Sequence, residues 1–441
     1  MKEVVELTPK DIVKELDKYI ISQKEAKKSV AISLKNRDRR KKINDINMRK
    51  EITPKNVILI GPTGVGKTEL ARRMANIVNA PFMKIEATKY TEVGYVGKDV
   101  ESIIRDLAEL TFRRMKEEMY EDLREKSYEI VIEKIAKKVK PYDSLIDSEK
   151  EKIIKEIKAG IYDDMEIEIE RKGKPSNFPM VEIIGGGNID SAGIGTFFES
   201  MLSGIELGKE KILVPVSDGI KRLLDEEIES KINLELLKSK VVENVENNGI
   251  VFIDEIDKIA ERSGAERGEV SRQGVQRDIL PIVEGSTVMT SFGPVKTDHI
   301  LFIAAGAFSQ SSPSDLMPEL QGRFPIQVRL KNLEKGDFVK ILTEVEYNLI
   351  DQYKAMLATD NVKLEFEESA IDEISKIAVK FNENIENIGA RRLASVIEEV
   401  LRNIMYEAPY KSLKKILIDK KYVQKIYKKE KEKENLDKFI L

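Results

Sequence analysis

The 441-residue chain is long enough for two or three domains, and it contains no cysteine and a single histidine, His299. Disulfides, thiolate chemistry, cysteine-based zinc sites and histidine-cluster metal sites are therefore excluded. Its 75 basic and 78 acidic residues leave a net charge of -3, so its charge gives no reason to expect a nucleic-acid or membrane partner. The one local excess of positive charge, in residues 37–42, we interpret as a solvated helix face.

The N-terminus lacks the apolar core of a signal peptide, and no stretch approaches the ~18–20 apolar residues of a membrane span. We therefore expect a soluble, cytoplasmic protein. Three short apolar runs, at residues 57–60, 250–253 and 300–304, are typical of buried strands in a parallel sheet. Helical patterns follow the first of them at 68–78 and 99–115, so the sequence predicts an α/β core whose parallel sheet is flanked by helices.

The middle of the chain differs from this core in composition. After about residue 110 the sequence becomes highly charged, and it then passes through a segment rich in proline and glycine. This predicts an inserted intermediate domain at 110–237, helical and partly disordered, between two parts of the large domain at 1–109 and 238–330. Beyond 331, apolar residues at helical spacing predict a small C-terminal helical domain, 331–441.

Residues 61–68, GPTGVGKT, follow the first predicted strand and open a helix. They fit the phosphate-binding pattern G-x-x-x-x-G-K-[ST], in which glycines let backbone N–H groups close around phosphate oxygens at a helix N-terminus. We expect Lys67 to meet the β- and γ-phosphates of ATP, and Thr68 to offer its hydroxyl to Mg²⁺. An ordinary glycine turn is the alternative interpretation of the same residues.

Asp254 and Glu255 end the second predicted strand. There Asp254 would help to hold Mg²⁺, directly or through water, and Glu255 would polarise the attacking water as general base. A strand-end helix cap is the alternative, and the phosphate loop favours the catalytic interpretation. The long stretch between the two motifs agrees with a large insertion, because a βαβ unit needs only about 30 residues or somewhat more.

Three further segments complete a resemblance: residues 19–23 (YIISQ), 318–324 (PELQGRF) and 388–393 (IGARRL). Together with the two motifs above, they resemble the HslU family of AAA+ ATPases, Clp/Hsp100 unfoldases that work with the peptidase HslV. The resemblance implies that Ile21 contacts adenine, although Ser22 stands where the family usually carries glycine. It implies an arginine finger at Arg323, with Glu319 nearby, that reaches the γ-phosphate of a neighbouring subunit.

The same resemblance implies that Arg391 is the sensor-2 contact to the nucleotide, whereas Ala305 gives the sensor-1 strand no catalytic residue. Lys67, Glu255 and Arg323 would be the catalytic residues. The nucleotide contacts would be Ile21, Gly64, Val65, Gly66, Lys67, Thr68, Glu69, Asp254, Glu319 and Arg391.

Two further segments are candidates for binding other proteins. Residues 94–97, GYVG, match the family's pore loop, in which Tyr95 and Val96 would grip a substrate chain; a tight turn with a packed tyrosine is the alternative. The chain ends in Phe439, Ile440 and Leu441, apolar residues that in the family dock into HslV; folding back on the small domain is the alternative.

The resemblance thus implies a homohexameric ring that hydrolyses ATP, unfolds protein substrates, and both feeds and activates HslV. A stand-alone unfoldase similar to ClpX is the alternative, though the absence of cysteine removes the zinc-binding N-domain expected of it. A nucleic-acid motor on the same ATPase core is a further alternative, which the balanced charge disfavours.

Overall fold

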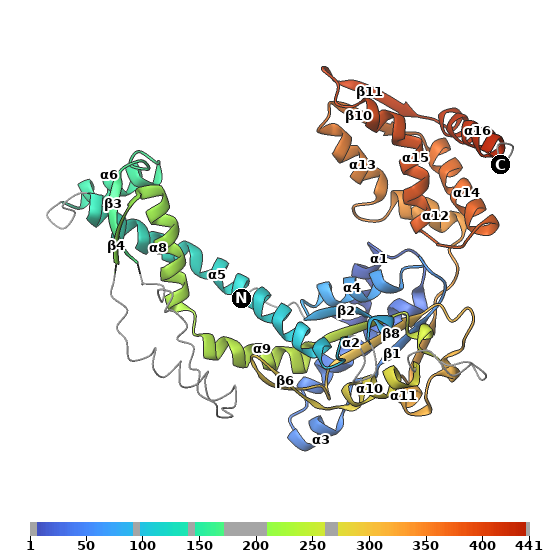
Figure 1. Ribbon diagram of the computed structural model, residues 1–441, viewed down its shortest axis with the longest axis horizontal. Coiled ribbons are helices and arrows are strands. Elements are labelled where there is room, and N and C mark those ends of the chain that lie inside the picture. Colours follow the sequence, from blue (N-terminus) through green and yellow to red (C-terminus); the bar gives the residue numbers. More distant parts are fainter. Residues whose placement is uncertain (1–6, 91–97, 140–145, 172–209, 261–271, 438–441) are drawn as a thin grey trace, which may run out of the picture. The chain divides into compact units, whose positions relative to one another are not determined.

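The computed structural model describes residues 7–90, 98–139, 146–171, 210–260 and 272–437 (Figure 1). The chain divides into two compact units, one made of Met1–Phe112 with Lys238–Leu441 and the other of Arg113–Leu237. Helix α5 (Ser102–Val139) contributes residues to both. The finer division into four parts, with its boundaries at 109, 237 and 330, stays a prediction.

The larger unit is built on a five-stranded sheet in which every described pairing is parallel. Its order is β2 (Phe82–Glu86), β5 (Ile250–Asp254), β8 (Leu301–Gly306), β1 (Val57–Ile60) and β9 (Ile326–Arg329). The predicted α/β class is confirmed. The three predicted strands are its buried centre, whereas the two edge strands, β2 and β9, were not predicted because their alternating, half-buried residues lack a continuous apolar run.

Helices α1 (Pro9–Asp17), α2 (Lys24–Lys41) and α4 (Lys67–Ile77) pack with this sheet around one apolar core (Figure 1). Thr8 starts α1 with a capping box to Asp11, which satisfies the first free N–H groups of the helix. The remaining elements of this part are α3 (Ile46–Glu51), η1 (Ala87–Lys89), α9 (Leu234–Asn248), η3 (Ile256–Lys258), α10 (Arg272–Glu284), the antiparallel pair β6 (Thr287–Thr290) and β7 (Gly293–Lys296), η4 (Pro313–Asp315) and α11 (Pro318–Arg323).

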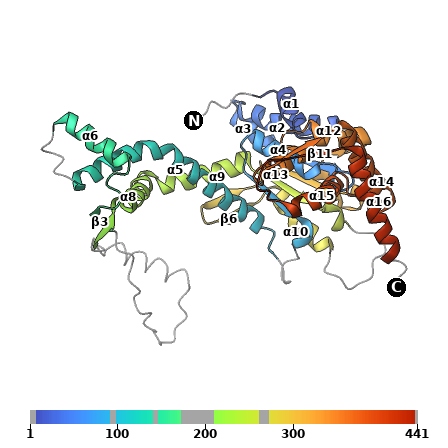
Figure 2. The same ribbon diagram turned by 90° about the horizontal axis from the view of Figure 1, so that it is seen from above.

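The C-terminal part has a separate apolar core. Its helices are α12 (Lys335–Thr343), α13 (Leu349–Ala358), α14 (Glu368–Asn384), α15 (Arg391–Glu407) and α16 (Lys420–Asp437), and α14 and α16 lie side by side in Figure 2. It is not helical throughout, because β10 (Val362–Phe366) pairs in parallel with β11 (Lys414–Ile418). Each strand has only five residues, two of them exposed and charged (Lys363 and Glu365 in β10, Lys414 and Lys415 in β11), so neither gives a long apolar run in the sequence.

The smaller unit contains most of α5, α6 (Asp147–Lys158) and α8 (Val216–Lys231), and an antiparallel pair of strands, β3 (Glu166–Arg171) and β4 (Glu210–Pro215). Ile135, Ile167 and Ile228 are buried in its core. The helices were predicted and the strand pair was not, and residues 172–209 lie outside the described part. None of the described helices is both long enough and apolar enough to cross a membrane.

Candidate nucleotide site

The phosphate loop connects β1 to α4 at the carboxyl edge of the sheet. Gly64 and Gly66 have φ of 74° and 101°, in the left-handed region that residues with a Cβ rarely adopt. A Cβ on Gly64 would also lie 2.0 Å from the carbonyl oxygen of Ile388. Glycine at both positions is therefore required by the backbone, and the loop leaves the N-terminus of α4 open to an anion.

Lys67 is buried, and its Nζ donates to the carbonyl oxygens of Gly61 and Pro62, the latter at 2.8 Å. Burial lowers the pKa of this ammonium, while the charges of Asp254 and Asp257 partly restore it and that of Arg391 lowers it further. No described carboxylate forms an ion pair with Lys67. A partly desolvated cation that bonds only to neutral carbonyls favours an anionic ligand.

Thr68 and Asp254 come together although they are far apart in the chain. The Thr68 hydroxyl donates to Asp254 Oδ2 at 3.2 Å, and the Nζ of Lys84 on β2 lies 3.1 Å from the same carboxylate oxygen. The described residues hold no group of three or more histidine, aspartate or glutamate side chains that could bind a metal unaided. A hydroxyl beside one carboxylate is nevertheless the kind of oxygen pair that holds Mg²⁺ jointly with substrate phosphates, so the residues fit that ion.

Glu255 follows Asp254 with φ of 57°, a left-handed conformation that is uncommon for a residue with a side chain. Its backbone N–H donates to Asp254 Oδ1 at 3.1 Å. The Glu255 side chain is exposed and makes no hydrogen bond or ion pair within the described part of the chain. Such local strain is found at functional sites, and the carboxylate is free to accept a proton.

These groups line one cavity of about 580 Å³, a size typical of small-molecule sites. Ten of the predicted residues belong to its lining: Ile21, Gly64, Val65, Gly66, Lys67, Thr68, Glu69, Asp254, Glu255 and Arg391. An open helix N-terminus, a buried lysine and a hydroxyl beside a carboxylate provide the donors and oxygens that a magnesium-bound nucleotide requires. The cavity therefore fits such a ligand.

The C-terminal part of the chain closes one side of this cavity. Ala390 N–H donates to Gly64 O at 3.0 Å, and Gly389, with φ of 57°, packs so closely that an added Cβ would lie 2.6 Å from Gly64. Arg391 lines the cavity, is exposed, and makes no hydrogen bond or ion pair with other described residues. The phosphate loop and the start of α15 thus touch directly.

Ser22 explains how the turn before α2 forms without the family's usual glycine. Its φ is 58° and that of Gln23 is 53°, so two consecutive residues are left-handed. The Ser22 hydroxyl donates a hydrogen bond to Asp337 Oδ1 on α12. The side-chain amide of Gln23 donates from Nε2 to Lys331 O at 2.8 Å and accepts at Oε1 from Lys331 N–H at 2.9 Å. Side-chain bonds to the residues from 331 onward therefore hold this turn in place.

The sequence analysis missed several lining residues, among them Asp257, Leu333, Ile341 and Val345. Asp257 is buried and accepts from the backbone N–H of Phe308 at 3.3 Å. Its position three residues after Asp254, in the sequence DEID, was a usable signal. The three apolar residues belong to the C-terminal part of the chain, and nothing in the sequence around them distinguishes them from core residues.

Glu319 and Arg323 on α11 do not line the cavity. Both are exposed, and the Arg323 guanidinium donates to Glu284 Oε1 from Nη2 at 2.8 Å and from Nε at 3.0 Å. The backbone is also held, because Asn56 Nδ2 donates to Arg323 O at 3.0 Å. Within one chain, these two residues are separate from the nucleotide cavity.

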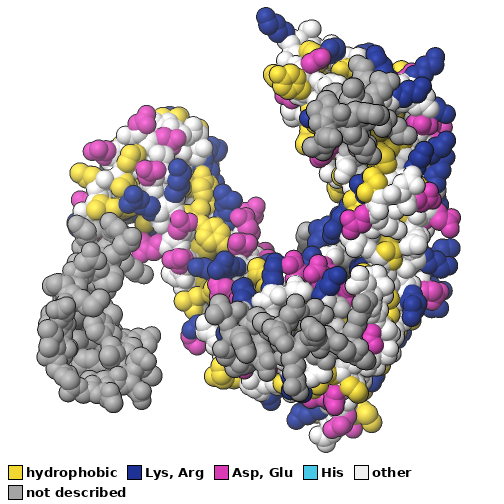
Figure 3. Space-filling model, turned by 45° about the vertical axis from the view of Figure 1, so that its right-hand side comes forward, with side chains coloured by type: hydrophobic (Ala, Val, Ile, Leu, Met, Phe, Trp, Pro, Cys, Tyr) yellow, Lys and Arg dark blue, Asp and Glu magenta, His cyan; other side chains and the backbone are white. Residues whose placement is uncertain are grey.

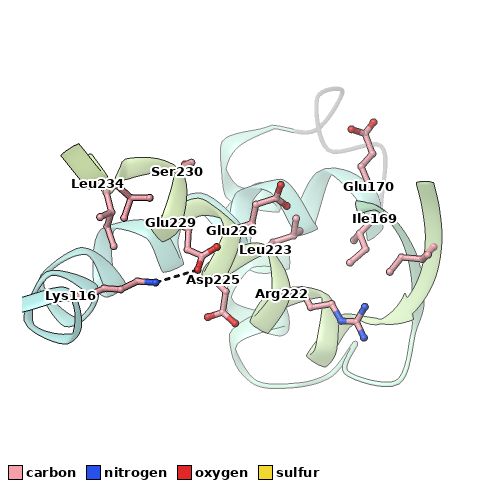
Figure 4. A pocket seen from close by; sticks show the side chains of 12 residues that line it. Lys116, Ile169, Glu170, Arg222, Leu223, Asp225, Glu226, Glu229, Ser230 and Leu234 are labelled. Atoms are coloured by element: carbon pink, nitrogen blue, oxygen red, sulfur yellow. Dashed lines mark ion pairs between the residues drawn. The ribbon is translucent and has the colours of Figure 1, made fainter. Parts of the chain in front are cut away.

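Tyr95, Val96, Phe439, Ile440 and Leu441 lie outside the described residues, and their roles stay predictions. A larger cavity, of about 740 Å³, lies in the smaller unit (Figure 4). Its lining includes Glu170, Asp225 and Glu226, and Lys116 lies 3.7 Å from Glu229 across it. Four carboxylates in one lining (Glu170, Asp225, Glu226 and Glu229) would repel phosphates, so the larger cavity is not the nucleotide site.

Three family profiles match the chain. They are the AAA domain (Cdc48 subfamily) at residues 209–327, the ATPase family associated with various cellular activities (AAA) at 57–120, and the C-terminal D2-small domain of ClpB protein at 333–421. The first two contain the acidic pair and the phosphate loop, and the third contains Arg391.

The chain is 49% identical over 453 residues to the "ATP-dependent protease ATPase subunit HslU" of Persephonella marina, covering 99% of each protein. It belongs to the HslU family. The proteins of the same name from Thermotoga maritima and Agrobacterium fabrum are 46% and 47% identical, covering 100% and 95% of each chain. Family membership confirms the predicted resemblance and enzyme class, so the chain is an AAA ATPase and binds ATP.

Proposed function

We propose that this chain is the unfolding subunit of a two-part protease, in which ATP hydrolysis drives protein substrates into the peptidase HslV. The observation that carries the proposal is the convergence of the phosphate loop and the acidic pair on one cavity. The full-length relatives, each an ATPase subunit of an ATP-dependent protease, support the same assignment. They favour it over a stand-alone unfoldase or a nucleic-acid motor.

Within the cavity each residue has a chemical task. Magnesium-bound ATP supplies a γ-phosphoryl group that water can accept, and this chain's residues hold and activate the reactants. Lys67 and the N–H groups of the phosphate loop neutralise and orient the phosphates. Thr68 and Asp254 would hold Mg²⁺, whereas Glu255 would take the proton of the attacking water. Arg391 would contact the phosphates, and Ile21 the adenine ring.

The exposed position of Arg323 supports action on a different subunit. A ring subunit presents one surface to the cavity of its neighbour, and a cation there can stabilise the charge that develops on the phosphoryl group. We therefore assign Arg323, with Glu319 nearby, to the cavity of the next copy in a homohexamer. The ion pair with Glu284 would have to open for the guanidinium to reach it.

The remaining assignments concern proteins outside the ring. Tyr95 and Val96 would grip an unfolded chain and advance it as the angle between the large and small domains changes. Phe439, Ile440 and Leu441 would dock into HslV and activate it. Reducing conditions suit a chain without cysteine, and the cytoplasm is the proposed location. On the face drawn in Figure 3, positive and negative side chains are interspersed, which gives no support to a nucleic-acid partner.

The test is reconstitution of the complete reaction. The purified chain, HslV, ATP, Mg²⁺ and a stably folded fluorescent protein are mixed, and the loss of fluorescence and the released peptides are followed. We expect both with the native chain and neither with Glu255→Gln. A chain lacking residues 436–441 should hydrolyse ATP normally but fail to activate HslV. Full activation of HslV by this truncated chain would refute the docking assignment.

A further inference from the structure

The basic run at the end of α2 is only partly the solvated helix face that the sequence suggested: Arg39, Lys41 and Lys42 are exposed, but two arginines are not. Arg37 and Arg40 are only 7% and 8% exposed. The two residues are three apart on α2, so they project from the same face of the helix. Burying two guanidinium groups is expensive unless each is paired, and this makes their partners informative.

Both guanidinium groups bond to neutral backbone oxygens. Arg37 Nη2 donates to Asn247 O at 3.0 Å, and Arg40 Nε donates to Arg49 O at 2.8 Å. Neither forms an ion pair with any carboxylate in the described residues. Burial lowers the pKa of Arg37 to about 10 and also lowers that of Arg40. Two buried positive charges thus lack an anion.

These side chains line a cavity of about 230 Å³, together with the exposed cations Arg39 and Lys55. Among the described residues, twelve line the cavity, and none of them is an aspartate or glutamate. The charge of Asp38 acts on Arg37 and that of Asp298 acts on His299, but neither residue lines the cavity. The cavity therefore presents four positive charges and no acidic side chain.

Two polar atoms in the lining add hydrogen-bonding capacity that no described residue uses. Ser33 is 4% exposed, and within the described part of the chain its hydroxyl has no hydrogen-bond partner; His299 Nδ1 is likewise buried without one. Burial lowers the pKa of His299, and the charges of Arg40 and Arg37 lower it further. Unsatisfied buried polar atoms are rare in native proteins, and a ligand that accepts hydrogen bonds would satisfy them.

This cavity is distinct from the nucleotide cavity. Lys55 precedes β1, Asn247 precedes β5 and His299 precedes β8, so the lining lies where parallel strands begin. The phosphate loop and Asp254, by contrast, lie where β1 and β5 end. The two cavities occupy opposite edges of the same sheet, and none of the residues that the structure describes lines both.

We propose that this cavity is a second anion site, which binds a phosphate group of inorganic phosphate or a small phosphomonoester. Arg37 and Arg40 provide the charge, and Ser33 and His299 provide further donors. Guanidinium groups bind phosphate well because their N–H groups match its oxygens in pairs. A carboxylate from a second copy of the chain offers similar chemistry, and assembled rings separate the two possibilities.

The chain's only histidine makes the site observable. With ¹³Cε1-labelled histidine, the assembled ring is saturated with Mg·ADP to fill the nucleotide cavity and then titrated with inorganic phosphate. We expect the single imidazole signal to move saturably and the pKa of His299 to rise, because a bound anion stabilises the imidazolium. Lys41 and Arg49 also lie near these arginines, so chloride at equal ionic strength serves as reference.

Three variants test whether the phosphate binds in this cavity. Arg37→Met should weaken phosphate affinity by about tenfold or more, since it removes a charged donor. Ser33→Ala, which removes one neutral donor and is a milder change for the fold, should weaken it by about threefold. Lys28→Met removes a charge from the exposed part of the same helix and should leave phosphate affinity unchanged.

Three results would overturn the proposal. The first is an imidazole signal that responds equally to phosphate and chloride, or to neither. The second is equal weakening by Lys28→Met and by the two cavity variants, which would indicate general electrostatics. The third is phosphate binding in dissociated chains that disappears in the assembled ring, which would mean that a second copy fills the cavity.

Discussion

The nucleotide cavity and helix α11 differ in how complete they are within one chain. At the cavity, ten predicted residues from both ends of the sequence converge, and Gly64 touches the segment that carries Arg391. On α11, the predicted finger Arg323 lies outside the cavity and pairs with Glu284 at the surface. One chain therefore holds what is needed to bind a nucleotide, whereas the charge proposed to speed hydrolysis would come from a second chain.

This difference suggests how the motor is controlled. In the proposed ring, binding would occur at every subunit, but fast hydrolysis would require the Arg323–Glu284 pair to open beside an occupied neighbour. A surface ion pair stabilises by only about 0–1 kcal/mol. Glu284 can therefore orient the Arg323 guanidinium without preventing its movement into the neighbouring cavity. The variants below separate the two regions, in order of decreasing effect.

Lys67→Ala should have the largest effect, with loss of both nucleotide binding and hydrolysis. The substitution removes the buried cation of the phosphate loop, and Arg391, the other cation assigned to the phosphates, is exposed to solvent. Equilibrium binding of a fluorescent ATP analogue measures the loss, and Lys28→Ala, an exposed lysine on α2, is the matched control. Retained micromolar affinity in Lys67→Ala would contradict the assignment of the cavity.

Arg323→Ala should bind ATP normally but hydrolyse it on the order of 10³-fold more slowly, as expected when an arginine finger is removed. The exposed Arg402, which lies near Glu399 at 3.4 Å, gives a matched control in Arg402→Ala. Steady-state hydrolysis and binding are measured on the same preparations. A parallel loss of binding would show that Arg323 supports the structure of its own subunit.

Glu255→Gln should slow hydrolysis by about 10²- to 10³-fold with ATP affinity unchanged, since general-base catalysis contributes on this scale. Glutamine keeps the size of the side chain but cannot accept the proton of water. Single-turnover hydrolysis, started after binding is complete, isolates this step. Normal turnover would mean that another group is the base, and Asp257 would then be the first candidate.

Ser22→Gly should have the smallest effect. Glycine adopts the left-handed backbone of position 22 at a conformational free energy about 1 kcal/mol lower than serine does, which stabilises the fold. Two losses oppose this gain: the hydrogen bond to Asp337 disappears, and glycine raises the conformational entropy of the unfolded chain. These contributions nearly cancel, so we expect ATP affinity to fall by about two- to threefold with little change in Tm. A tenfold fall in affinity would mean that this one bond controls the pocket.

Much of the nucleotide cavity could be predicted because its chemistry fixes the local sequence. Gly64, Gly66 and Lys67 are set by phosphate geometry, and β1 and β5 are continuous apolar runs. The edge strands β2 and β9, and the pair β10 and β11, were missed because short or half-exposed strands resemble loops. The surface position of Arg323 depends on Glu284, a partner distant in the chain, and tertiary contacts of that kind leave no local signal.

The burial of Arg37 and Arg40 shows the same limit. A charged run on a helix normally faces solvent, and only the neighbours of α2 in the folded chain decide otherwise. Periodicity cannot detect a cavity whose walls come from residues before β1, β5 and β8.

Mixed rings test the central claim, that the active site is shared between two chains, most directly. Glu255→Gln and Arg323→Ala, each nearly inactive alone, are co-assembled in equal amounts and their ATP hydrolysis is measured. Random mixing places an intact cavity against an intact finger at about one interface in four, so activity should return to roughly a quarter of the native rate. Mixed rings that form, as native mass spectrometry would show, but hydrolyse no faster than the separate variants would contradict the account.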